Sequence, residues 1–368
     1  RGTTQNDILK EYIARNTYIY PPRESMRIIG DMIQFCSKHV PQWYPISISG
    51  YHMREAGSNA IQELAFTFAN AIEYINTCVS RGLKVDEFAP RLSFFFCCTM
   101  ELFEEVAKFR AARRIYAKIM KERFGAKSDK STHLRFHVQT SGESLTAQQV
   151  DNNVVRVTLE ALSAVLGGCQ SLHTNSRDEA LALPTEESVK VALRTQQIIA
   201  NETGVTKTVD PLSGSYYIEY LTSEIEEGVE KYLNNIEKIG GSLAAIETGF
   251  FQEEIRRNAY QLKKEIDYND RIIVGVNKFQ DQNDVEPELN TIDPEIELRQ
   301  VKKLKEFKKS RDQTKVNSEL SKLQKFAEKD DENLMPHIIS SVKAHVTLGE
   351  ISDVFVDIYG RYEPKFSF

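Results

Sequence analysis

The chain has 368 residues, of which 41% are hydrophobic and 27% charged, and its formal net charge is -6. This balance is that of a folded globular protein rather than a disordered or fibrous one, and the negative charge gives no reason to expect nucleic acid or a membrane surface as a partner. Five cysteines without zinc-ligand spacing favour a reduced, cytoplasmic protein, and no apolar run approaches the ~20 residues that cross a bilayer.

Strands and helices are expected to alternate through the first half of the chain. Helical spacing covers residues 8–13 and 25–35 before any strand pattern, so the strand belonging to them is expected just upstream of Arg1. Short apolar or alternating runs predict strands at 44–49, 92–98, 133–139 and 169–173, and helical patterns between them include 60–74 and 102–119. This alternation predicts a parallel sheet that is either doubly wound or barrel-shaped.

From residue 210 the alternation stops, and helices are expected at 223–239 and 243–266. An acidic stretch over 281–298 and a basic stretch over 299–311 indicate a linker followed by an amphipathic helix. The apolar stripe of that helix, Val301, Leu304 and Phe307, is expected to pack on a partner or on the barrel rather than to bind nucleic acid. A last short helix is expected at 347–355.

Polar side chains follow the predicted strands at their carboxyl ends, which is where barrel enzymes carry their chemistry. His52 could donate a hydrogen bond to a substrate oxygen, and a buried structural histidine is the alternative. His137 and Gln139 share a strand face, and Gln170 is placed on the next strand. Such a stripe needs either a large polar ligand or bound water.

Two arginines are candidates for binding an anion. Arg15 lies at a helix end shortly before two prolines and could clamp a carboxylate with two N–H groups, or it could be an ordinary surface arginine. Arg91 is expected to open the second strand and to share a face with Ser93, so that both could meet one ligand. A metal site is also open, because His52, His137 and His173 each end a different strand.

Several long motifs occur together in one order. They are Thr4-Gln-Asn-Asp-Ile-Leu-Lys-Glu11, Ser47-Ile-Ser-Gly-Tyr-His-Met53 with Glu55-Ala-Gly57, Phe88-Ala-Pro-Arg-Leu-Ser-Phe-Phe95, Gln139-Thr-Ser-Gly142, Gln170-Ser-Leu-His-Thr-Asn175 with Asp178-Glu-Ala-Leu181, and Ile273-Val-Gly-Val-Asn-Lys278. From the first residue to about Lys278, they resemble the large (alpha) subunit of the methylmalonyl-CoA mutase family, whose members are adenosylcobalamin-dependent acyl-CoA mutases.

The resemblance implies an α/β fold, in which this chain would form the C-terminal half of a TIM (β/α)8 barrel followed by a helical extension. Residues 1–215 would be four strand–helix units of the barrel, 216–280 a helical extension packing on it, and 281–368 a charged linker with C-terminal helices. The chain, which opens on Arg1, is interpreted as a fragment or processed product. Without the first half of the barrel it is expected neither to close nor to turn over.

The resemblance also implies a reaction, the isomerisation of (R)-methylmalonyl-CoA and succinyl-CoA. Adenosylcobalamin would supply a radical that takes a hydrogen from the substrate, while the protein would exclude water and hold the thioester. By motif, the catalytic residues would be His52, Tyr51 and Gln5. The acyl-CoA substrate would contact Thr3, Gln5, Arg15, His52, Arg91, Ser93 and His137, and the cofactor would contact Ala14, Tyr51, Gln139, Gly142, Glu179 and Ala180.

Two further features bear on substrate and partner. Arg15 favours a carboxylated acyl group, whereas Phe94-Phe-Phe96-Cys-Cys98 departs from the family's usual Phe-Phe-Trp-Gly and keeps an isobutyryl-CoA-type mutase as the alternative. The sequence has no Asp-x-His-x-x-Gly motif, so the lower ligand of cobalt is expected from a separate small cobalamin-binding subunit in a hetero-oligomer. A non-catalytic partial subunit used in assembly and a metal-dependent hydrolase are the remaining alternatives.

Overall fold

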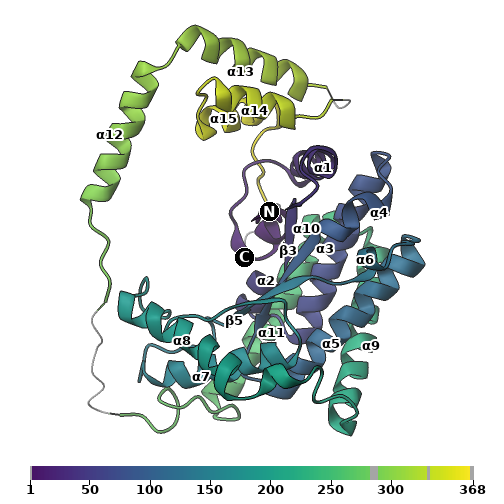
Figure 1. The fold of residues 1–368 in the computed structure, drawn as a ribbon, viewed down its shortest axis with the longest axis vertical. Coiled ribbons are helices and arrows are strands. Elements are labelled where there is room, and N and C mark those ends of the chain that lie inside the picture. The colour runs from purple at the N-terminus through teal and green to yellow at the C-terminus, as the bar shows by residue number, and fades with distance from the viewer. Residues whose placement is uncertain (1, 282–288, 330–331, 365–368) are drawn as a thin grey trace.

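The computed structural model describes residues 2–281, 289–329 and 332–364, and its centre is a four-stranded parallel sheet with helical connections (Figure 1). The strands lie in their sequence order, β3-β4-β5-β6. A doubly wound sheet reverses its strand order at a switch point, so this order favours a sector of a barrel. The strands are β3 (Ile46–Ser49), β4 (Leu92–Cys98), β5 (Phe136–Thr140) and β6 (Ser171–His173).

All four predicted strands of the sheet are confirmed, with shifted bounds at three of them. The sequence did not predict the short strand β1 (Gly2–Thr3), which pairs in parallel with β2 (Trp43–Tyr44), and a strand upstream of Arg1 stays a prediction. Gln170 was placed on the fourth strand, but it precedes β6, and its side-chain oxygen accepts a 2.7 Å hydrogen bond from the backbone N–H of Phe136. Its side chain therefore holds the start of the strand pair together.

The two faces of the sheet differ in chemistry because successive strand residues point to opposite sides. Phe94, Phe96, Phe136 and Val138 belong to the main hydrophobic core, which also includes side chains of the connecting helices. Burying one such side chain contributes on the order of 1.5–3 kcal/mol. The opposite face carries Ser, His, Gln and Cys side chains and is called the lumen face below.

Helices cover the core face and connect the strands. The longest of those that follow a strand, α3 (Ala60–Ser80), begins with a capping box: Asn59 accepts from the N–H of Gln62, and Gln62 accepts from the N–H of Asn59. The others are η1 (Glu11–Arg15), α1 (Pro22–His39), α2 (Tyr51–Glu55), α4 (Val85–Phe88), η2 (Ala89–Arg91), α5 (Leu102–Lys118), η3 (Ile119–Arg123), α6 (Asp129–Thr132), α7 (Asn152–Leu166), α8 (Glu186–Glu202) and η4 (Val205–Lys207).

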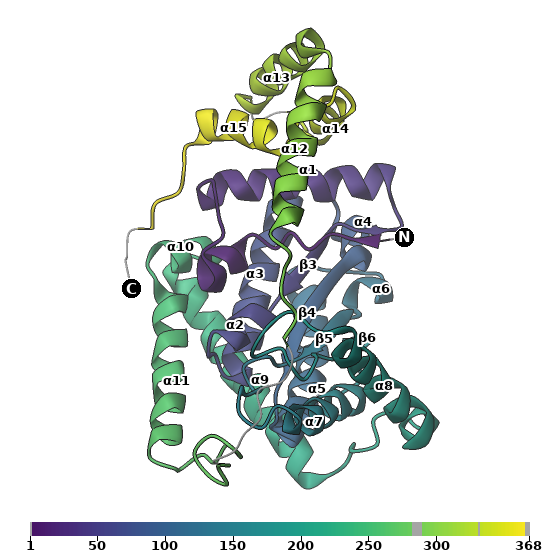
Figure 2. The same cartoon turned by 90° about the vertical axis from the view of Figure 1, so that its left-hand side faces the viewer.

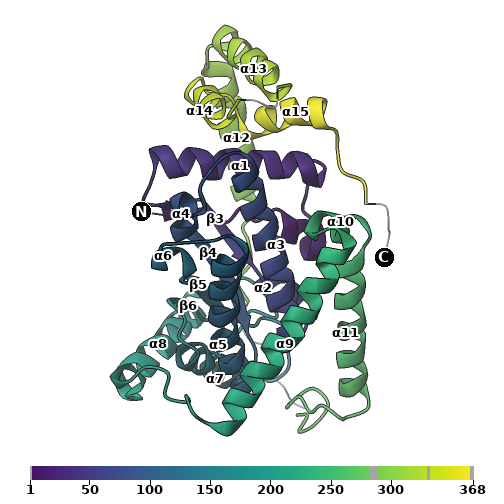
Figure 3. The ribbon, with the colours of Figure 1, turned by 90° about the vertical axis from the view of Figure 1, so that its right-hand side faces the viewer.

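A helical extension packs on the outside of these helices. Its first helix, α9 (Tyr216–Ile239), crosses α3 and α5 (Figure 3). The single helix expected at 243–266 is wrong: α10 (Ser242–Glu247) and α11 (Phe250–Asp267) are separated at Gly249, whose φ of 73° interrupts the helix. Glycine is also required at Gly57, where φ is 108° and a Cβ would lie 2.5 Å from the Cβ of Ala259 on α11.

The last helices form a second hydrophobic cluster, called the C-terminal unit here. It consists of α13 (Gln313–Ala327), α14 (Met335–Lys343) and α15 (Leu348–Tyr359), and it lies beside α1 in every view (Figures 1 and 2). The expected short helix at 347–355 is confirmed by α15, which begins with a capping box between Thr347 and Glu350.

The predicted amphipathic helix is present as α12 (Glu295–Ser310), but it does not pack on the sheet and its helices (Figure 1). Val301, Leu304 and Phe307 stay 40 to 44% exposed, and the contacts lie at the helix end, where Phe307 meets His345 and Lys308 pairs with Glu350. The prediction that this apolar stripe packs on the barrel is therefore wrong within the described residues. No helix within the described ranges is both long enough and apolar enough to cross a membrane.

Candidate active site

The lumen face arranges the predicted polar residues in two rows across the strands. Ser49, Phe95, His137 and Ser171 are register partners in one row, and Cys97, Gln139 and His173 form the next row toward the carboxyl ends. The Nδ1 atom of His137 lies 2.7 Å from the Ser171 hydroxyl. The stripe predicted from strand alternation is therefore present as hydrogen-bonding groups on neighbouring strands, interrupted at Phe95 in the first row.

Tyr51 and His52 rise above this surface because α2 starts directly after β3. Gly50 makes the turn, and a Cβ there would lie 2.6 Å from the Thr67 hydroxyl. The ring of Tyr51 stacks on Phe95 with centroids 4.8 Å apart, and His52 meets the same phenylalanine edge-on at 5.9 Å. The sequence reasoning did not single out Phe95, which supports both rings.

His52 is held in its neutral form. Burial, which has the largest effect, and the positive charges of Lys10 and Arg15 together lower its pKa to about 3. Its Nδ1 atom lies 3.0 Å from the hydroxyl of Ser49, whose own N–H donates a 2.8 Å hydrogen bond to the buried carboxylate of Asp7. The imidazole is thus positioned by a chain of contacts that runs back into the core.

Arg15 lies at the end of η1, a π-helical turn that stops where Asn16 adopts a left-handed conformation, with a φ of 54°. Its guanidinium is about half exposed and pairs with Glu11 at 3.8 Å. Glu11 also accepts a hydrogen bond from Thr17. Because η1 contacts α2, the two sequence-predicted groups lie in one neighbourhood, and the positive charge of Arg15 contributes to lowering the pKa of His52.

Glu55 joins α2 to the loop after β5, a role the sequence reasoning missed. Its carboxylate accepts from the Ser141 hydroxyl at 2.6 Å, from the N–H groups of Gly142 and Glu143 at 3.1 and 3.0 Å, and from the Cys97 thiol at 3.4 Å. Burial raises the pKa of Glu55 although these donors lower it. The only sequence signal was a polar residue beside the His52 motif, which names no partner.

Asn175 links the last two strand ends and was also missed as a site residue. Its side-chain oxygen accepts from Gln139 at 2.8 Å, and its amide donates to the Thr140 carbonyl at 2.9 Å. Nearby, Glu179 and Ala180 are exposed on the same rim, and partial burial raises the pKa of Glu179. The rim therefore presents an ordered amide, a carboxyl group and an open surface.

Comparison with known proteins identifies the family of this chain. A family model described as methylmalonyl-CoA mutase matches residues 1–361. The chain belongs to the methylmalonyl-CoA mutase family. Members of this family use adenosylcobalamin.

Named relatives of the mutase family match nearly the whole chain. The 2-hydroxyisobutanoyl-CoA mutase large subunit of Aquincola tertiaricarbonis is 50% identical over 98% of this chain and 64% of its own length. The methylmalonyl-CoA mutase of Escherichia coli is 48% identical over 98% of this chain and 50% of its own length, and the mitochondrial human enzyme is 46% identical over 48% of its length. The chain thus spans about half to two thirds of these relatives.

Other mutase-motif residues are placed less closely together. Thr3 and Gln5 are exposed, and Ala14 is partly buried in η1. Arg91 ends the turn η2 before β4 begins, so the prediction that it shares a strand face with Ser93 is wrong; its guanidinium instead lies 5.4 Å from the ring centre of Tyr44. The Ser93 hydroxyl donates to the Ile46 carbonyl at 2.8 Å.

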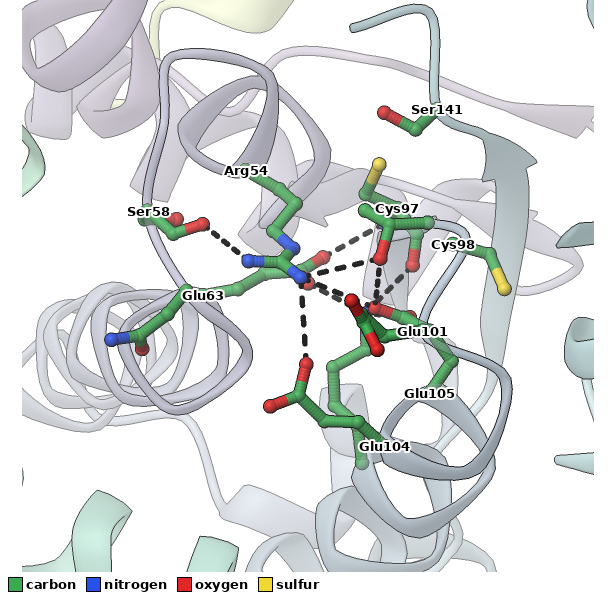
Figure 4. A network of polar contacts seen from close by, with 12 residues as sticks. Arg54, Ser58, Glu63, Cys97, Cys98, Glu101, Glu104, Glu105 and Ser141 are labelled. Atoms are coloured by element: carbon green, nitrogen blue, oxygen red, sulfur yellow. Dashed lines mark hydrogen bonds and ion pairs between the residues drawn. The ribbon is translucent and has the colours of Figure 1, made fainter. Parts of the chain in front are cut away.

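A buried ionic network lies behind the mutase lumen face (Figure 4). Lys108 contacts Glu63 at 2.7 Å, Glu105 at 2.5 Å and the Cys97 carbonyl at 2.8 Å, with all three charged side chains fully buried. Arg54 points between Glu104 and Glu105 and pairs with the latter at 3.4 Å. Glu63 also accepts from the Cys97 N–H at 2.8 Å, so the network binds both the N–H and the carbonyl of Cys97 near the end of β4.

The alternative of a histidine metal site finds no support in the geometry. His52, His137 and His173 do not gather, and no group of three or more His, Cys, Asp or Glu side chains within residues 2–281, 289–329 and 332–364 is arranged to hold a metal ion. The Nδ1 atom of His137 lies within hydrogen-bond distance of the Ser171 hydroxyl. Burial, together with neighbouring His173, lowers the pKa of His137.

Proposed function

We propose that the chain is part of the catalytic large subunit of an adenosylcobalamin-dependent mutase that interconverts (R)-methylmalonyl-CoA and succinyl-CoA. The observation that carries the proposal is the contact between η1, which presents the half-exposed Arg15 guanidinium, and α2, which holds His52 against Ser49 at the end of the lumen face. A thioester needs a hydrogen-bond donor, and a dicarboxylic acyl group also needs a cation. Family membership supports the reaction class.

His52 would donate a hydrogen bond to the thioester oxygen without giving up a proton. A neutral imidazole carries one N–H, and the Ser49 hydroxyl is placed to donate to Nδ1, which would leave the proton on Nε2. The low pKa means that the ring stays neutral at physiological pH. Tyr51, stacked on Phe95, would shield this position from water.

Arg15 would bind the free carboxylate of the substrate. Glu11 orients the guanidinium from one side and leaves it about half exposed. A carboxylate satisfies two parallel N–H groups, whereas the hydroxyl of a 2-hydroxyisobutanoyl group offers no counter-charge. This is why we favour a carboxylated substrate, although the relative that is 50% identical is named a 2-hydroxyisobutanoyl-CoA mutase.

The rim at the strand ends fits the cofactor that the family uses. Gln139 and Asn175 present ordered amides, and Glu179 and Ala180 leave the rim open. A large ligand with many amide groups requires such partners. When bound, adenosylcobalamin supplies the radical that abstracts a substrate hydrogen. The chain's part is to hold the loop after β5 through Glu55 and to support Tyr51.

A small cobalamin-binding subunit would complete the enzyme as a hetero-oligomer. This rests on the "large subunit" in the name of one relative. The remaining strands of the barrel would come from the part of the large subunit that corresponds to the length of the relatives that this chain does not span. A chain that only assists assembly would bind the same subunit without supporting turnover.

The test compares substrates in the complete enzyme, with the whole large subunit, its small subunit and adenosylcobalamin. Arg15→Gln should lower kcat/KM for methylmalonyl-CoA by the equivalent of about 2–5 kcal/mol, the usual cost of removing one partner of a charge pair that binding buries. Arg23→Gln, at an exposed arginine on α1, is the matched control. Unchanged activity of Arg15→Gln, or faster wild-type turnover of isobutyryl-CoA or 2-hydroxyisobutanoyl-CoA, would overturn the proposed substrate.

A further inference from the structure

The segment that carries Arg15 is closed into a compact loop. The Tyr12 hydroxyl donates to the carbonyl of Tyr20, which brings the two ends of residues 12–20 together, and it also lies 2.8 Å from the Ser25 hydroxyl. The rings of Tyr12 and Tyr18 stack with centroids 4.9 Å apart. Arg15 therefore projects from a loop whose base is a pair of tyrosines. This loop, residues 12–20, is called the Arg15 loop below.

A residue from the far end of the chain completes the base of this loop. Tyr362 meets the rings of Tyr12 and Tyr18 edge-on, each at 5.1 Å between centroids. The N–H of Tyr362 donates a 2.9 Å hydrogen bond to the carbonyl of Ile19. Although it lies more than 340 residues away in sequence, Tyr362 contacts three positions of the loop.

The C-terminal unit contacts the same region of the protein. Tyr362 follows the last helix of this unit, so the contacts of the unit help to fix its position. Arg27 on α1 donates to the carbonyls of Ala327 and Phe326 at 2.6 and 3.2 Å. The Asp31 carboxylate accepts from the N–H of Leu334 at 3.1 Å. Tyr20, at the end of the Arg15 loop, packs against Phe355 of α15 with centroids 5.9 Å apart.

The opposite side of the loop is held by the helical extension. Gln252 on α11 donates a 3.0 Å hydrogen bond to the carbonyl of Tyr12. The loop thus lies between α11 and the C-terminal unit, and the left-handed Asn16 next to Arg15 is at its tip. A displacement of either neighbour would move the guanidinium relative to His52.

We propose that the C-terminal unit is a positioning element for substrate binding, acting through Tyr362 on the Arg15 loop. The inference rests on the proposed function of Arg15 as the carboxylate ligand. Tyr362 does not itself touch substrate. It fixes the position of the Arg15 guanidinium and thereby determines the affinity for the carboxylate end of the acyl group. The contacts to CoA and to the thioester do not depend on it.

The experiment measures binding in the complete large and small subunits without cobalamin, so that no turnover occurs. Calorimetry compares succinyl-CoA with butyryl-CoA, which has the same chain length and no free carboxylate. Tyr362→Ala is expected to weaken succinyl-CoA binding about tenfold, the equivalent of losing two edge-to-face ring contacts, and to leave butyryl-CoA binding within about twofold. Tyr362→Phe keeps the ring and should bind both ligands as the wild type does.

The controls separate a local effect from loss of folding. Tyr268→Ala removes an exposed tyrosine at the end of α11 and should change neither affinity. Hydrogen exchange of the backbone amides of residues 15–18 should rise in Tyr362→Ala, while that of α3 stays unchanged. If Tyr362→Ala does not fold, Tyr362→Leu, which keeps an apolar side chain but not the ring, takes its place with the same expectation.

Each outcome decides one of the two proposals. Equal weakening of both ligands, or of neither, by a folded Tyr362 variant would overturn the positioning role. Arg15→Gln, measured in the same way, tests the proposed function by itself: if it left succinyl-CoA affinity unchanged, the carboxylate clamp would be wrong. If Arg15→Gln weakened succinyl-CoA binding and the Tyr362 variant did not, the clamp would stand and the role of the C-terminal unit would fall.

Discussion

Replacing Lys108 by methionine tests the buried ionic network most directly. The ammonium group is fully buried and contacts two carboxylates, Glu63 and Glu105, as well as the Cys97 carbonyl. Burial lowers the pKa of Lys108, but the two carboxylates raise it more, so the side chain is charged. Methionine is similar in length to the apolar stem of lysine, but it lacks the charge and cannot make any of the three contacts.

The magnitude follows from what remains after the substitution. Glu63 and Glu105 would share only Arg54 as a cation, which leaves one buried negative charge without a partner. Breaking a buried charge cluster in this way usually costs about 3–5 kcal/mol. The whole stability of a domain is roughly 5–15 kcal/mol, so the variant should lose a large part of it.

Denaturant unfolding of the complete large subunit measures this loss, and a double variant checks its cause. Lys108→Met combined with Glu63→Gln removes one charge of each sign, including the carboxylate that does not pair with Arg54, so it should be more stable than Lys108→Met alone. A loss below about 1 kcal/mol for Lys108→Met would refute the argument from uncompensated charge, as would a double variant less stable than the single one.

Two further predictions concern the site itself. Glu55→Gln should speed hydrogen exchange at the N–H groups of Gly142 and Glu143, because an amide oxygen accepts more weakly than a carboxylate; unchanged exchange there would count against the role of Glu55. His52 should stay neutral down to about pH 3, whereas the unfolded chain gains a proton near pH 6.5, so this residue makes stability fall as the pH drops through that window. His52→Asn should therefore show a smaller drop in Tm between pH 6.5 and 4, and equal drops would contradict the low pKa.

The sequence predicted the elements of the fold well wherever a local pattern decides. Strand β4 was found with its bounds because seven consecutive residues suited to a buried strand follow Arg91. The single helix expected at 243–266 failed because the apolar spacing continues through Gly249, and only the backbone conformation of that residue shows the break. Strand β1 was missed because two residues are too short to show a period.

The sequence by itself determined which residues are candidates: His52, Arg15 and the polar residues at the strand ends follow from alternation, strand ends and family motifs. Only the tertiary structure decided which of them act together. It put Arg15 near His52, gave the Glu55 carboxylate its four donors, and brought Tyr362 onto the Arg15 loop. The physical reason is that these contacts join residues far apart along the chain, and such pairings depend on packing, which leaves no periodic signal in the sequence.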